Sequence, residues 1–218
     1  MFNRCGIRSS GVYHSGVEIK DIMTSSLLSK CARHPAWLVA FVALIVLMFF
    51  AGASLARRHW DPMACVDEGT FFRDGDPNRN AGYDGQFAYY IPDDPLQADA
   101  RLDAPAYRYL HILYPLLAWL LSLGGQEALI PWVLIGINLV ALSVVTAWLG
   151  ELLVLHGAGR WYGMAVPLFA GMLFALRQDL NEPLALAPAL GALVALPSDP
   201  ICHAFRTLCS QRCGCRLV

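Results

Sequence analysis

Asp84 stands in a short stretch whose composition suits acid–base chemistry. The stretch reads Gly82-Tyr83-Asp84-Gly85-Gln86-Phe87-Ala88-Tyr89-Tyr90, so the carboxyl group lies between two glycines and among four aromatic residues. Glycine permits tight or left-handed backbone at low steric cost, which would let a ligand come close. Desolvation by apolar surface raises the pKa of a carboxyl group towards values useful to a general base. The alternative is an aspartate that binds its own backbone in a glycine-rich turn.

A cation follows at the edge of a later apolar run. Asp103 can cap a helix that begins at Ala104-Pro105 and continues to Tyr114. Arg108 and His111 are three residues apart, so this helix would place them on one face. A cation beside aromatic and apolar residues suits an anionic headgroup. The alternatives are interfacial snorkelling of arginine and tyrosine, and a structural role for the histidine.

A second acidic stretch, Arg177-Gln178-Asp179-Leu180-Asn181-Glu182-Pro183, separates two further apolar runs. Charges this close to apolar segments are costly unless they reach water or a site. On a helix the Asp179 and Glu182 carboxyl groups, three residues apart, would face one way. The alternative is a polar loop in which Pro183 starts the next helix.

The elements that must position these residues are mainly apolar. The chain has 218 residues, of which 56% are hydrophobic and 15% charged, and this balance indicates an integral membrane protein. The net charge is −1 and not strongly basic, so nucleic acid is not expected as a partner. The lipid bilayer is the expected surrounding.

The apolar residues are gathered into runs. Residues 36–56 are uncharged and long enough to span a bilayer, as are residues 128–149, which contain Asn138 and Thr146. We expect those two polar residues to form hydrogen bonds between helices. Shorter apolar runs cover residues 113–123, 161–176 and 183–196. The predicted fold is all-α, a polytopic membrane helical bundle.

The segment between the first two runs is a long acidic loop. Residues 57–108 hold ten acidic residues, six arginines and no lysine, and we expect them to be extracytoplasmic and to carry short helices. Residues 113–123 either span the membrane or lie in its interface. If they lie in the interface, Asp84, Asp179 and Glu182 share the outer face. If they span, Asp179 falls on the side opposite Asp84.

The two ends of the chain differ from this membrane domain, which covers residues 36–196. Residues 1–35 read as a disordered cytoplasmic leader, with Met23 as an alternative start. Residues 197–218 form an irregular cysteine-rich tail, interpreted as truncated or frame-shifted. Neither the tail cysteines, which lack zinc-ligand spacing, nor residues 74–78, which lack the ligands of an EF-hand, predict a metal site.

Three motifs together resemble the GT-C superfamily of membrane glycosyltransferases, related to polyprenol-linked mannosyltransferases. They are residues 82–87, the segment Leu102-Asp103-Ala104-Pro105-Ala106-Tyr107-Arg108-Tyr109 with Tyr114-Pro115, and residues 177–183. The resemblance covers roughly residues 36–196, the N-terminal part of such enzymes. It implies a bacterial inner-membrane, multi-pass protein with a cytoplasmic N-terminus and a first large loop outside.

The resemblance also implies a reaction. Asp84 falls where the family's loop carboxylate, taken as the catalytic base, should be. The donor would be a polyprenyl-phosphate sugar, with no cofactor and an unknown acceptor hydroxyl. Asp179 resembles a second acidic position near a later outer loop, and Glu182 is its neighbour. The further expected substrate-binding residues are Arg108 for the lipid phosphate, His111, Tyr83 and Gln86.

Two other functions remain open from the sequence. One is a non-enzymatic membrane protein, either a scaffold or a transporter fragment that captures cations with the acidic loop. The other is an inactive truncated gene product. A transporter should carry charges near mid-membrane, whereas the charges of this chain lie at the ends of its apolar runs.

Overall fold

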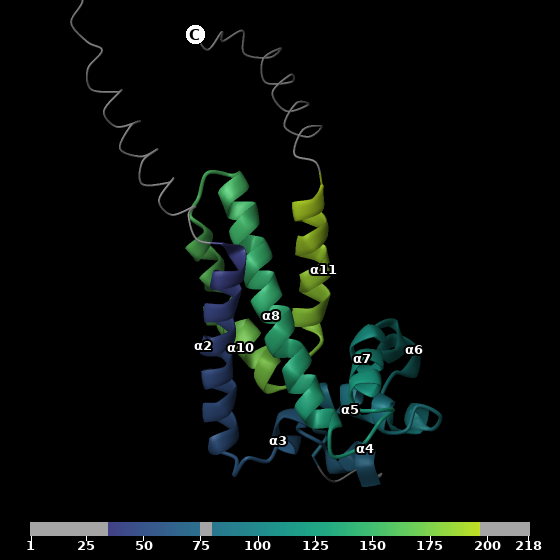
Figure 1. The fold of residues 1–218 in the computed structure, drawn as a ribbon. Coiled ribbons are helices and arrows are strands. Elements are labelled where there is room, and N and C mark those ends of the chain that lie inside the picture. The colour runs from purple at the N-terminus through teal and green to yellow at the C-terminus, as the bar shows by residue number, and fades with distance from the viewer. Residues whose placement is uncertain (1–34, 75–79, 197–218) are drawn as a thin grey trace, which may run out of the picture.

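The structure is a computed structural model that describes residues 35–74 and 80–196, and every regular element in these residues is helical. The expected leader and tail and most of the considered calcium segment lie outside the described residues. Helices α2 (Ala36–Ala56) and α8 (Ile130–Leu155) lie side by side and run in opposite directions, and α11 (Glu182–Ala195) packs along another side of α8 (Figure 1). The all-α prediction is confirmed for this part of the chain.

Helix α2 is apolar on all sides. Val39, Ala43 and Leu47, spaced four residues apart, are fully buried, and the helix packs against α8. Apolar side chains on other faces, such as Phe41 and Phe49, are more than half exposed. A helix that is hydrophobic all round is buried in a larger protein or in a membrane. Within the described residues, α2 and α8 are long and apolar enough to cross a membrane.

Helix α8 begins with Pro131 in its first turn, where its missing N–H costs nothing. It continues beyond residue 149 to Leu155. The Asn138 amide donates to the Tyr114 hydroxyl over 2.8 Å, which confirms the expected link between helices. The expectation for Thr146 is wrong, because its hydroxyl donates to the Leu142 carbonyl of the same helix over 2.7 Å.

The apolar run at residues 161–176 does not form one helix. It divides into η2 (Arg160–Met164), α9 (Ala165–Leu168) and α10 (Ala170–Arg177). Phe169 interrupts the run with extended backbone, φ −73° and ψ 125°, just after Pro167. The run therefore forms three short pieces that pack against α8, each too short to span a membrane. Helix α11 then starts at Glu182, with Pro183 in its first turn and Pro188 inside it.

Short helices gather at the end of the bundle where α8 begins (Figure 1). They are α3 (Met63–Val66), α4 (Thr70–Asp74), α5 (Gly85–Asp93), η1 (Ala98–Arg101), α6 (Pro105–Leu110) and α7 (Leu113–Leu121). Of these, α3, α5, η1 and α7 contribute residues to a buried cluster with α8 that includes Phe87, Tyr90, Tyr114 and Leu134. The expectation of short helices in the acidic loop is confirmed, and its core anchors it to α8.

The helix expected from residue 104 to residue 114 is broken. Helix α6 ends at Leu110, His111 leaves the helical conformation, and α7 starts at Leu113 so that Pro115 falls in its first turn. Nine residues of helix are about 13 Å long, too short to cross a bilayer. Helix α7 instead packs on α5 and α8. This arrangement leaves Asp84 and Asp179 at the same end of the bundle.

Candidate active site

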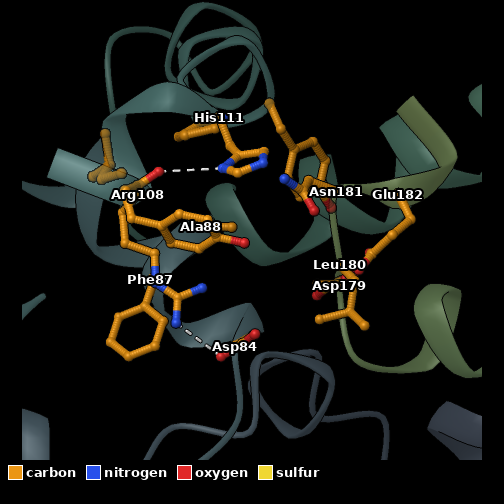
Figure 2. A pocket seen from close by; sticks show the side chains of 13 residues that line it. Asp84, Phe87, Ala88, Arg108, His111, Asp179, Leu180, Asn181 and Glu182 are labelled. Atoms are coloured by element: carbon orange, nitrogen blue, oxygen red, sulfur yellow. Dashed lines mark hydrogen bonds and ion pairs between the residues drawn. The ribbon is translucent and has the colours of Figure 1, made fainter. Parts of the chain in front are cut away.

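A small polar pocket lies between the acidic loop and the start of α11 (Figure 2). Its volume is about 80 Å³. The sequence brings its walls from three places: α5 with the residue before it, the α6–α7 segment, and the connection from α10 to the first residue of α11. The lining residues are Asp84, Phe87, Ala88, Ile91, Tyr107, Arg108, His111, Tyr114, Pro115, Asp179, Leu180, Asn181 and Glu182.

Asp84 is the residue immediately before α5, and its side chain makes no capping hydrogen bond. Its Oδ1 accepts a hydrogen bond from Arg108 Nη2 over 2.9 Å, and 62% of its side chain is exposed. The alternative of an aspartate bound to its own backbone is therefore not what the structure has. The exposure also corrects the expectation of a carboxyl group desolvated by aromatic neighbours.

Arg108 is held by two carboxyl groups. Its Nε and Nη2 atoms each donate to Asp103, over 2.8 Å, in addition to the contact with Asp84. Its guanidinium group lies 4.0 Å from the centre of the Phe87 ring. The hydrogen bonds from Arg108 lower the pKa of Asp103 below its ordinary value. Asp103 is thus a partner of Arg108 and not the N-cap of α6, a position that Ala104 takes.

His111 turns its ring towards the pocket from the break between α6 and α7 (Figure 2). Its Nδ1 lies 3.2 Å from the Tyr107 carbonyl oxygen, and the two rings meet edge to face with centroids 5.0 Å apart. The expected common helical face with Arg108 is not found, because the helix ends before His111, but both residues line the same pocket.

Asp179 is the most unusual group in the pocket wall. It is 0% exposed, and neither carboxyl oxygen has a hydrogen-bond partner. Desolvation by burial raises its pKa well above the ordinary value. Its backbone is left-handed, with φ 49°, so it lies in a turn and not on a helix with Glu182. The loop alternative for residues 177–183 is therefore the one found, with Glu182 as the first residue of α11.

Gly85 explains how the two acidic stretches come together. A Cβ atom at this position would lie 2.2 Å from the Gln178 carbonyl oxygen, so only glycine permits the observed approach. The Gln178 side chain donates to Asp67 Oδ2 over 3.3 Å, a second link across 111 residues. The glycine next to Asp84 is therefore required for backbone packing, and this packing places Asp179 in the pocket wall.

Two expected substrate-binding residues do not line this pocket. The Tyr83 ring packs edge to face on Phe174, with centroids 5.4 Å apart. Gln86 is buried, accepts from the Gly69 N–H over 3.0 Å and donates to the Ala81 carbonyl over 2.8 Å. Both residues support the loop.

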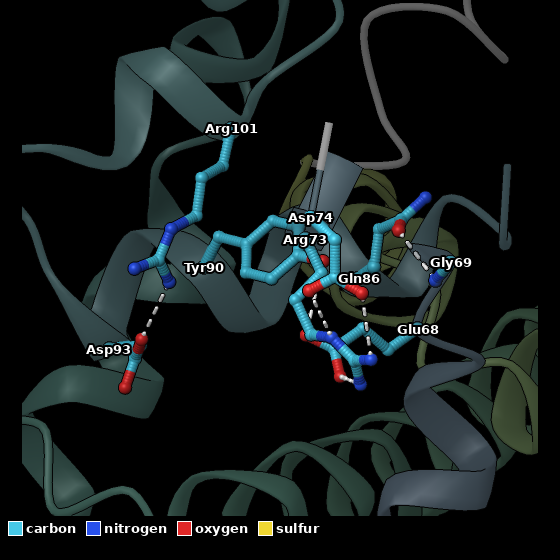
Figure 3. A network of polar contacts seen from close by, with 8 residues as sticks. All are labelled: Glu68, Gly69, Arg73, Asp74, Gln86, Tyr90, Asp93 and Arg101. Atoms are coloured by element: carbon cyan, nitrogen blue, oxygen red, sulfur yellow. Dashed lines mark hydrogen bonds and ion pairs between the residues drawn. The ribbon is translucent and has the colours of Figure 1, made fainter. Parts of the chain in front are cut away.

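The neighbouring polar network also supports the loop (Figure 3). The Tyr90 hydroxyl donates to Glu68 over 3.2 Å, and Arg101 pairs with Asp93 over 3.2 Å. The Arg101 guanidinium group lies 5.7 Å from the centre of the Tyr90 ring. Several acidic residues of the loop are therefore structural.

Other pocket residues were missed from the sequence. Tyr114, which holds Asn138 of α8, looks like an ordinary interfacial tyrosine, and Asn181 follows the strained turn without any motif of its own. The pairing of Asp103 with Arg108 was also missed, because Asp103 was expected to cap the helix. Cys65 of α3 is also buried close by, and burial raises the pKa of its thiol to about 11.

The described residues contain no group of three or more His, Cys, Asp or Glu side chains placed to hold a metal ion. Comparison with protein-family models, with curated proteins and with solved structures gives no match to this chain. The candidate site is therefore defined by its own geometry.

Proposed function

We propose that this chain is a membrane glycosyltransferase, or part of one, that transfers a sugar from a polyprenyl-phosphate donor to an acceptor hydroxyl. In this proposal the helices form a polytopic bundle in a bacterial inner membrane, with a cytoplasmic N-terminus and the pocket at the outer face. The observation that carries the proposal is a polar pocket with an apolar groove next to it.

The groove lies between α7, α8 and α11 and has a volume of about 530 Å³. Its lining is apolar and includes Leu117 and Leu184, each three residues beyond a residue of the polar pocket, Tyr114 and Asn181. Side chains with this spacing are neighbours along a helix, so the two spaces lie next to each other. A ligand with a charged head and a long apolar tail would occupy both spaces. A prenyl chain suits the groove because burial of apolar surface is favourable and needs no directional partner.

The residues of the pocket suggest how the reaction would proceed. The acceptor oxygen attacks the anomeric carbon, the bond from that carbon to the phosphate oxygen breaks, and its electron pair leaves with the phosphate. Asp84 takes the acceptor proton, and Arg108 stabilises the leaving phosphate. Asp84 contributes one exposed contact to Arg108, whereas Asp103 contributes two. Phosphate would therefore displace Asp84 from Arg108 and free it to accept a proton.

The position of the charges favours an enzyme over a transporter. In α8 the acidic residue is Glu151, close to the C-terminal end, where it pairs with Arg160 over 2.9 Å. The polar pocket lies instead at the opposite end, beside the acidic loop. A cation pathway would require charged residues further along the spans.

The test is transfer by the chain reconstituted in lipid vesicles, supplied with radiolabelled polyprenyl-phosphate mannose and glucose and with a membrane extract as the source of acceptors. We expect Asp84→Asn to reduce transfer by about 10²–10⁴-fold, because the amide cannot take the proton. Asp94→Asn is the matched control, since Asp94 caps the end of α5 and accepts from the Leu96 N–H over 3.3 Å. Equal transfer by both variants would remove Asp84 from the reaction, and no transfer by the unmodified chain would contradict the function.

A further inference from the structure

Asp179 is a carboxyl group that the protein buries without giving it a partner. Both oxygens lack hydrogen bonds, and its carboxyl group forms no ion pair with any described cation. Arg108, whose guanidinium group lines the same pocket, is occupied by Asp84 and Asp103. An isolated buried carboxylate is so costly that the group takes up a proton instead.

The backbone around Asp179 holds this group in place. Its backbone is left-handed, with φ 49°, a conformation that aspartate and asparagine tolerate better than most other residues. Because Gly85 has no side chain, the carbonyl group of Gln178, the residue before Asp179, can approach α5. Two distant segments are thus shaped to keep a single unpartnered carboxyl group at the wall of the pocket.

We infer that Asp179 is a neutral carboxylic acid that donates its proton in a hydrogen bond to a phosphate oxygen of the lipid donor. The inference rests on the proposed function. The pocket already contains the acidic residues Asp84 and Glu182, and a third negative charge would repel a phosphate. A neutral acid has one O–H donor, and the phosphate supplies the partner that Asp179 lacks. The pocket volume of about 80 Å³ suits a group of this size.

This role differs from that of a general base, because the proton remains on Asp179 throughout. Two substitutions separate the roles. Asp179→Asn keeps a neutral hydrogen-bond donor, and asparagine is well tolerated in the left-handed region. Asp179→Gly removes the donor without adding backbone strain. A hydrogen-bond donor tolerates the first change and not the second, whereas a base tolerates neither.

The titration of Asp179 has to be separated from that of its neighbours. Several titratable or charged groups lie around Asp179, on helices α3, α6, α7 and α11 and at the residues next to α5 and α6. These groups are Cys65, Asp84, Arg108, His111, Tyr114 and Glu182. The Asp179→Asn variant retains all of them, so a difference between it and the unmodified chain reports Asp179 alone.

The experiment measures binding of farnesyl phosphate to the full chain in lipid nanodiscs, by calorimetry over a pH series. At low pH we expect Asp179→Asn to bind like the unmodified chain and Asp179→Gly to bind at least about tenfold more weakly. As pH rises and Asp179 loses its proton, the unmodified chain should bind farnesyl phosphate more weakly than Asp179→Asn does. The variant has no titrating group at this position, so its own pH dependence serves as the reference for titration of the ligand.

The outcomes distinguish this inference from the proposed function. Binding that is the same in Asp179→Gly overturns the inference and leaves the phosphate site intact. No binding by the unmodified chain overturns both. Infrared spectroscopy gives a readout without ligand: the carbonyl band of a protonated carboxyl group should be present in Asp84→Asn and absent in Asp179→Asn. A band unchanged by Asp179→Asn also overturns the inference.

Discussion

At the scale of single residues, Asp179 should make stability depend on pH. Its pKa in the folded protein is raised by burial, whereas an aspartate in an unfolded chain has a pKa of about 3.9. Between these two values the folded protein binds more protons than the unfolded chain, so stability is highest below the unfolded pKa and falls as pH rises towards the raised pKa.

We therefore expect Asp179→Asn to flatten this pH dependence and to raise the thermal unfolding midpoint at neutral pH. The measurement is unfolding in nanodiscs over a pH series. Asp99→Asn is the control, because Asp99 is exposed. If stability declined more steeply with pH in Asp179→Asn than in the unmodified chain, burial of Asp179 would not be the source of the pH dependence.

Arg108 gives a second prediction at this scale. Arg108→Lys keeps the charge but loses the planar pair of donors that binds both oxygens of Asp103. We expect weaker farnesyl phosphate binding than in the unmodified chain, by about tenfold. Arg101→Lys is a matched control, since Arg101 pairs with Asp93 outside the pocket. If only Arg101→Lys lost binding, Arg101 and not Arg108 would be the residue that holds the phosphate.

At the scale of elements, the approach of α5 to the α10–α11 connection depends on Gly85. Gly85→Ala would place a methyl group against the Gln178 carbonyl oxygen, and overpacking of this kind costs about 1–3 kcal/mol. We expect a lower unfolding midpoint together with weaker farnesyl phosphate binding.

Gly52→Ala of α2 serves as the comparison for this change. A Cβ atom there meets nothing within 4 Å, and alanine favours a helix over glycine by about 1 kcal/mol. It should leave stability equal or higher and binding unchanged. If both alanine variants behave alike, the approach at Gly85 is not what positions Asp179.

The elements also show how far sequence reasoning extends. The bounds of α2 follow from an uncharged run without proline, and they agree with the prediction. The breaks at His111 and Phe169 were not predicted, because each position was taken as part of one continuous run, although Pro115 and Pro167 stand close to them. At the site, the residue types selected Asp84, Arg108 and His111, but the burial of Asp179 depends on contacts between distant segments that spacing does not reveal.

At the scale of the whole molecule, the short helices that line the pocket and the C-terminal end of α8 lie at opposite ends of the bundle (Figure 1). If the pocket faces outward, a single cysteine introduced at Leu96, which is 92% exposed, should react with an impermeant thiol reagent in intact cells. A cysteine at the exposed His156 should react only after lysis. The background for both is a chain with its native cysteines replaced by serine. The reverse pattern would place the acidic loop in the cytoplasm.

The buried thiol of Cys65 has a practical consequence for the dynamics of this end. It packs with Leu55 and Ile135 beneath the loop and is 3% exposed. Because the thiolate is the reactive form, burial and a pKa of about 11 both slow its modification in the closed state. With the other native cysteines replaced, the labelling rate would report transient opening of the loop. A ligand that seals the pocket should slow that rate, which makes Cys65 a native sensor of occupancy.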